Sequence, residues 1–209
     1  MGPDLDVPWA AKLAEAGADA FWNYRGRDAP SPAEHALAGE LAVGTAVVVH
    51  ALGGGPDEVR IWFARAAGAL MGALRAPGPV RWTVAKVTPD GATRTERQAD
   101  DSLASPERAQ LARWCALLAG DDAPVEDLGA RGHMADALGA LERGERPRFR
   151  AALHAVLVDH RRRYAGTEHE PRALLFLPAL GLAALGLRAR LVSRADLPAA
   201  DPLLPGSLL

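Results

Sequence analysis

The sequence predicts a mainly α-helical domain: a helical bundle, or a stack of antiparallel helical hairpins, with one small β-hairpin. Apolar residues recur at three- and four-residue spacing through most of the 209-residue chain. Proline, glycine or a capping residue marks the ends of most of these segments. Only residues 80–98 read as a pair of strands around a turn. Because the helices are joined by short loops, we expect antiparallel neighbours.

Three helices are predicted in the first part of the chain, over residues 8–24, 31–52 and 57–75. The second opens on Ser31 and Glu34, a capping box in which each side chain bonds to the other residue's amide. In the first helix one apolar stripe is formed by Trp9, Leu13, Ala16 and Ala20. On or near one face of the third lie Val59, Ile61, Trp62, Leu70 and Leu74.

The β-hairpin is expected over about residues 80–98. Residues 80–87 read VRWTVAKV, and the Thr-Pro-Asp-Gly sequence at 88–91 is a strong turn signal. Residues 92–98 return as the second strand, and their charges indicate a solvated edge.

The second half predicts helices over residues 105–120, 124–128, 133–142, 147–164 and 171–187, with a short strand at 191–193. Gly144 is the expected stop of the 133–142 helix. Pro178 either kinks the last helix or belongs to its first turn. The inner stripe of the 105–120 helix is Leu111, Trp114, Cys115 and Leu118; that of the 147–164 helix is Phe149, Leu153, Val156, Leu157 and His160. The single cysteine is therefore interpreted as a packed core thiol.

Composition favours one domain spanning residues 1–209, with enough apolar residues (49%) for a core without metals or disulfides. The net charge of -2 gives no reason to expect nucleic acid. The longest uncharged apolar stretch, residues 173–187, is shorter than the roughly 20 residues that span a bilayer. With no signal peptide at the N-terminus, we expect no membrane contact and a cytoplasmic location.

Motifs that carry chemistry are scarce, so no enzyme, cofactor or metal site is predicted. No two histidines have the four-residue spacing of a helical zinc site. The three glycines at 53–55 follow a helix and lack the P-loop lysine, so they are interpreted as a helix stop. One alternative stays open: an enzyme of unrecognised family in which His133, Asp159 and His160 converge in a pocket.

The densest acidic cluster is a candidate protein-binding site. It consists of Asp121, Asp122, Glu126 and Asp127. The simplest interpretation is a solvated loop. The functional alternative is a patch that steers a basic partner, because complementary charge accelerates association and sets specificity.

The C-terminal segment from Phe149 to Leu209 resembles the end of the immunity 49 proteins of bacterial polymorphic toxin systems. The resemblance rests on the order of parts: Phe149, Ala152, Leu153 and Leu157 along a helix, His160 and Tyr164 at its close, then Leu174, Leu175, Leu177, Pro178, Ala179, Leu180, Leu182, Ala183 and Leu185, then Val192-Ser193 and Leu197-Pro198, then a final pair of leucines. Upstream, the ribbon around Trp82 and the helix of Trp114 follow the order of the family's middle.

This resemblance implies an antidote that binds and neutralises a toxin made by the same cell. The toxin would be a protein, and a nuclease-type toxin would be basic. The family carries no catalytic residues, so none is transferred to this chain. The rival hypotheses are a helical adaptor that binds a peptide in a groove between helices, and the enzyme described above.

Overall fold

The protein is mainly helical, and the computed structural model describes residues 7–26, 28, 30–75, 80–87, 93–100, 106–121, 131–165 and 176–197. Its elements are α1 (Val7–Arg25), α2 (Pro32–Ala51), α3 (Pro56–Leu74), β1 (Val80–Val87), β2 (Thr93–Asp100), α4 (Pro106–Ala119), α5 (His133–Glu142), α6 (Arg146–Arg163) and α8 (Leu177–Arg188), followed by a 3-10 turn at Arg194–Asp196. None of the described helices is both long and apolar enough to cross a membrane.

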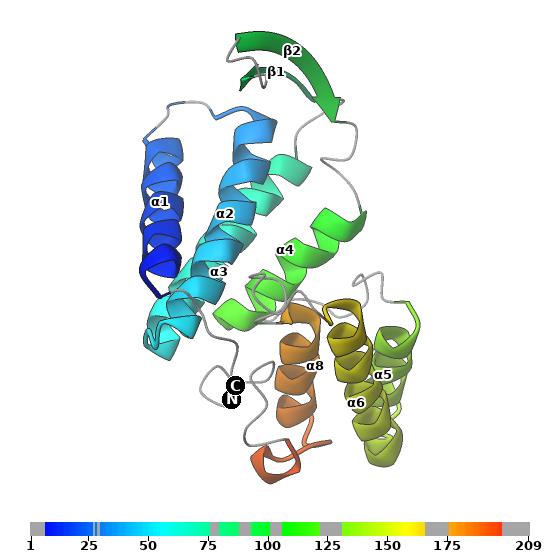
Figure 1. Cartoon of the computed structure of the whole chain (residues 1–209). Coiled ribbons are helices and arrows are strands. Elements are labelled where there is room, and N and C mark those ends of the chain that lie inside the picture. The colour runs from blue at the N-terminus through cyan, green and yellow to red at the C-terminus, as the bar shows by residue number, and fades with distance from the viewer. Residues whose placement is uncertain are drawn as a thin grey trace.

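The N-terminal helices form an up-and-down group in which α2 packs against both α1 and α3 (Figure 1). Helix α4 packs on α3 and leads to a second group of α5, α6 and α8, where α5 and α6 make a helical hairpin (Figure 1). One continuous cluster of buried apolar side chains runs through all seven of these helices, from Phe21 to Leu197. Helix pairs joined by short turns are therefore the building unit, as the sequence predicts.

Glycines set how closely several of these helices approach one another. A methyl group on Gly17 would collide with Thr45 of α2, and one on Gly181 would collide with the Trp114 ring of α4. The same holds where Gly186 of α8 faces Phe149 of α6. A side chain at any of these positions would push the helices apart, so the missing Cβ is what allows the close packing.

The predicted stripe of α1 is wrong at Ala16, whereas Ala20 is half-buried. Ala16 is exposed, whereas Gly17 and Phe21 are buried. The reason is the close approach at Gly17, which turns this side of α1 towards α2. Nothing is described for the side chains of Trp9 and Leu13, the other half of that stripe.

The predicted burial of Ile61 is also wrong, because its side chain is 51% exposed. Trp62, Val59 and Leu70 are buried as expected, and they occupy the arc of α3 that faces α2 and α4. Successive helical residues are 100° apart, which places Ile61 outside this arc.

Helix ends follow the glycine signals. Gly53, Gly120 and Gly144 have positive φ angles of 84°, 105° and 67°, and each follows the last residues of a helix. In each case the next amide donates to a carbonyl five residues back, as Gly54 does to Val49 at 2.8 Å, which is a Schellman motif. The interpretation of residues 53–55 as a helix stop is confirmed, and so is the capping box of Ser31 and Glu34.

The two strands pair antiparallel, with Val80 opposite Asp100 and Val87 opposite Thr93. The second strand thus extends two residues beyond the predicted 98. The turn predicted at 88–91 and the short helix predicted at 124–128 lie outside the described residues.

The last described segment confirms one prediction and corrects another. Pro178 belongs to the first turn of α8, which begins at Leu177. The predicted strand at 191–193 is wrong: the amides of Leu191 and Val192 both donate back to the Gly186 carbonyl, at 2.8 and 3.3 Å. Arg190, with φ 59°, makes this reversal, so the segment wraps over the end of α8 and does not extend as a strand.

Buried positions on α4 and α6 agree with the predicted inner stripes. Cys115 is fully buried and is a free thiol, and burial raises its pKa far above the usual range. Trp114, Phe149 and His160 are buried with it. The interpretation of Cys115 as a core thiol is confirmed.

Candidate functional site

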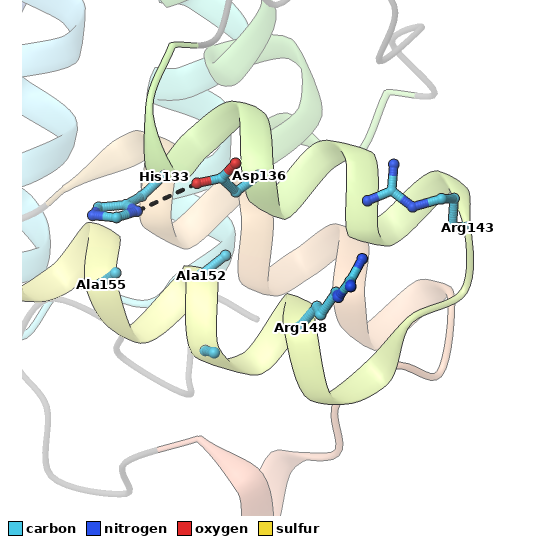
Figure 2. A pocket seen from close by; sticks show the side chains of 7 residues that line it. His133, Asp136, Arg143, Arg148, Ala152 and Ala155 are labelled. Atoms are coloured by element: carbon cyan, nitrogen blue, oxygen red, sulfur yellow. Dashed lines mark ion pairs between the residues drawn. The ribbon is translucent and has the colours of Figure 1, made fainter.

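A solvent-open groove of about 440 Å³ lies between α5 and α6 and is the best candidate for a functional site (Figure 2). We call it the α5–α6 groove. Its lining residues are His133 and Asp136 from α5, Arg143 directly after α5, and Arg148, Ala151, Ala152 and Ala155 from α6. The two helices pack antiparallel, so the start of α5 faces the end of α6.

Small residues make the floor of the α5–α6 groove. Ala152 and Ala155 lie three residues apart on α6, which places them on one side of the helix. Larger side chains there would fill the space between the helices. Figure 2 shows His133 and Asp136 towards one end of the groove and Arg143 and Arg148 towards the other.

The first end carries an imidazole between two carboxylates. His133 Nδ1 lies 3.4 Å from Asp136 Oδ2, and its Nε2 lies 3.7 Å from Asp159 Oδ2. All three side chains are about half exposed or more, with His133 49% accessible. A basic group of a partner could take the place of the imidazole between these two carboxylates.

The second end is a cationic pair that holds one carboxylate. Glu145 lies 3.2 Å from Arg143 Nε and 3.1 Å from Arg148 Nη1. The hydrogen bond from Arg143, and then the charges of both arginines, hold the pKa of Glu145 below its usual range despite some desolvation. The ionised Glu145 therefore fixes the two guanidinium groups at the mouth of the groove, where they can meet an acidic side chain.

The three residues of the enzyme hypothesis do not converge. His133 and Asp159 meet, as described, but His160 points about 100° away from Asp159 around α6 and is only 5% exposed. Its ring stacks on Phe176 with centroids 4.1 Å apart and contacts Tyr164 at 4.7 Å. His160 thus belongs to the core, where it packs α6 against the start of α8.

The acidic cluster is described only at its first residue. Asp121 is exposed just beyond α4, and its amide donates to the Ala116 carbonyl at 3.0 Å, so the residue completes the helix stop at Gly120. Asp122, Glu126 and Asp127 lie outside the described residues. The patch therefore stays a prediction.

A second charged cluster ties the chain after α8 to the start of α6. Asp196 Oδ2 accepts from the Ser193 amide and hydroxyl, both at 2.8 Å, and from Arg146 at 2.9 Å, while Oδ1 lies 3.2 Å from Arg150. These donors, the Ser193 amide first, depress the pKa of Asp196 far below its usual range. Two of the alternating arginines at the start of α6, Arg146 and Arg150, are thus engaged within the chain.

This cluster predicts a pH dependence of stability. Because the folded-state pKa of Asp196 is lowered, its contribution is present above the unfolded pKa of about 4 and is lost as the pH falls below it. Asp196→Asn should therefore reduce stability at neutral pH and flatten its decline between about pH 4 and pH 2. Urea denaturation across this range measures the slopes. Asp19→Asn, at an exposed site on α1, is the control. Parallel curves for Asp196→Asn and the wild type would contradict the prediction.

Within the described ranges, no three histidine, cysteine, aspartate or glutamate side chains are arranged to hold a metal ion. Comparison with known proteins adds no relative: no protein-family model matches the chain, and no curated protein or solved structure is significantly similar to it.

Proposed function

We propose that this protein is an immunity protein that binds a cognate bacterial toxin stoichiometrically and neutralises it. The observation that carries the proposal is the α5–α6 groove, an open trough with a small-residue floor and opposite charges at its ends. The resemblance of residues 149–209 to the immunity 49 proteins supports it, since α6 forms one wall of this groove.

The groove suits a protein partner because of its shape and charge. An alanine floor between two helices can accept an amphipathic helix or a row of side chains, the helix-in-groove mode of recognition. Asp136 and Asp159 at one end would attract a basic residue, and Arg143 and Arg148 at the other would attract an acidic one. Opposite charges at the two ends fix the direction in which the partner lies.

The second candidate is a helical adaptor that binds a peptide. The same groove favours it, because an amphipathic peptide helix can lie in a trough between two helices. The two hypotheses differ in the partner: a toxin is lethal when produced alone, whereas an adaptor's ligand is not.

Co-expression with the product of the adjacent large gene tests the function. We expect a stable one-to-one complex and rescue of growth when that product is toxic alone. Failure to rescue growth against every neighbouring gene, with the protein recovered uncomplexed, would overturn the immunity proposal. A stable complex with a harmless neighbour would favour the adaptor.

Filling the groove tests the site. Ala155→Trp places a large side chain on the floor, and it should weaken toxin binding by about tenfold or more and abolish protection without changing the melting temperature greatly. Ala135→Trp, exposed on α5 but not among the lining residues, is the matched control and should protect like the wild type. If both variants protect fully, the toxin does not use this groove.

In that case, reversing the charges of the 121–127 cluster should slow toxin association at low salt.

A further inference from the structure

One face of α3 carries large apolar side chains that none of the other described elements covers. Ile61 is 51% exposed and Met71 38%, and between them Ala64 and Gly68 are also exposed. Helices α2 and α4 pack against the buried arc of α3, where Trp62, Phe63 and Leu70 lie. We call the open stripe of Ile61, Ala64, Gly68 and Met71, with Asp57 and Arg75 at its ends, the α3 face.

The spacing of the α3 face is that of a helix–helix seam. Its members follow at intervals of four, three, four, three and four residues, the a/d pattern of packed helices. The two small residues lie in the middle, and no described atom outside the helix's own backbone and the neighbouring residues lies within 4 Å of where a Cβ on Gly68 would be. A second helix could therefore approach the centre closely and be flanked by the larger side chains.

The face is symmetric about its own midpoint, Ala66. Ile61 and Met71 lie five positions on either side of it, and Ala64 and Gly68 lie two positions away. A two-fold axis through this midpoint would set Ile61 against the partner's Met71 and Ala64 against the partner's Gly68. Each large side chain would then contact a large side chain of the partner, and each small residue a small one. An isologous contact requires this self-complementarity.

The charges at the two ends follow the same symmetry. Asp57 and Arg75 lie nine positions on either side of the midpoint, so the two-fold arrangement brings Asp57 to the partner's Arg75. Both are available: the Asp57 side chain is 93% accessible, with only an exposed contact to Arg60 at 3.4 Å, and Arg75 is exposed. Within one chain the two are 18 residues apart, or about 27 Å along the helix, and do not meet.

We infer that the α3 face is the interface of an antiparallel homodimer. Its self-complementarity in size and in charge identifies the occupant as a second copy, because an unrelated helix would not need a pattern that repeats in reverse. The inference is independent of the proposed function, since α3 lies in the other group of helices from the α5–α6 groove (Figure 1).

A charge swap tests this inference on the full-length protein. Sedimentation velocity over a series of concentrations should show the 22.0 kDa monomer giving way to a dimer as the concentration rises. Asp57→Arg and Arg75→Asp each create two like-charge contacts in the dimer, and each should weaken the dimer constant by about tenfold or more. The double variant exchanges the charges and should restore dimerisation.

The double variant distinguishes charge pairing between two chains from destabilisation of the single chain. Both substitutions oppose the helix dipole of α3, so within a monomer the double variant is the least favourable of the three. Recovery of the dimer in this variant can therefore come only from contact between the two ends across chains. Gly68→Trp, which blocks the close approach at the centre, should abolish the dimer, and its circular-dichroism melting curve checks that it folds. A wild-type mass that stays at 22.0 kDa at every concentration, or a double variant that remains monomeric, would overturn the inference.

Discussion

Replacing Gly181 with alanine is expected to lower the free energy of unfolding by about 2 kcal/mol, although alanine is the better helix former. The propensity gain is at most about 1 kcal/mol, whereas overpacking a filled core costs about 1–3 kcal/mol. An added Cβ would lie closer than 3.0 Å to the Trp114 ring, which is only 1% exposed and has no room to move. Chemical denaturation measures the difference, and thermal melting should show a loss of about 4–8 °C.

Gly44→Ala is the matched control for this prediction. Gly44 also lies within a helix, α2, but no described atom outside the helix's own backbone and the neighbouring residues lies within 4 Å of the position of its added Cβ. The same substitution should there stabilise the fold by up to about 1 kcal/mol, because only the propensity term remains. If the same glycine-to-alanine change lowers the free energy of unfolding at 181 and raises it at 44, the loss at 181 comes from the contact with Trp114.

A double-mutant cycle identifies the clash directly. Trp114→Leu removes the ring and is itself costly, but Gly181→Ala added to it should be nearly neutral, giving a coupling energy of about 1–3 kcal/mol. If Gly181→Ala costs as much with leucine at 114 as with tryptophan, the ring is not the cause. The α4–α8 contact would then depend on some other feature of the backbone.

These glycines also show how far the sequence predicts the fold. Apolar spacing, the capping box and the glycine stops predict the positions of most helices, because each signal is local to its helix. Which face of a helix is buried depends on its neighbours. Gly17 has no side chain and so no place in an apolar stripe, yet it decides the contact of α1 with α2. Ile61 shows the converse, since an apolar residue near the buried arc can still point outward.

The candidate site was less predictable from the sequence than the fold. The sequence predicts a pocket in which His133, Asp159 and His160 converge. Asp159 and His160 are adjacent on a helix and therefore point about 100° apart, so only one of them can face His133. The groove itself is marked by alanines, which carry no chemical signal in a sequence. Ala152 and Ala155 lie in a helix that begins and ends with arginines, and this pattern does not distinguish a groove from an ordinary helix surface.

Replacing Phe149 with alanine is expected to cost about 3–5 kcal/mol, the largest stability loss of any prediction made here. Phe149 is fully buried, and its ring packs on Gly186, where an added Cβ would be 2.7 Å from the ring's Cζ atom. Alanine would leave a cavity between α6 and α8, which the close-packed backbone of α8 could fill only in part. Phe149→Leu should cost less, because most of the volume is kept. His154→Ala, exposed on the same helix, should stay within about 0.5 kcal/mol of the wild type.

The same variant separates loss of fold from loss of binding. Helix α6 is one wall of the α5–α6 groove, so Phe149→Ala should weaken protection only as far as it unfolds the protein, and protection should recover at lower growth temperature. Ala155→Trp leaves the core intact and should fail to protect at every temperature. Equal temperature dependence in the two variants would mean that Ala155→Trp acts through stability, and its loss of protection would then say nothing about where the partner binds.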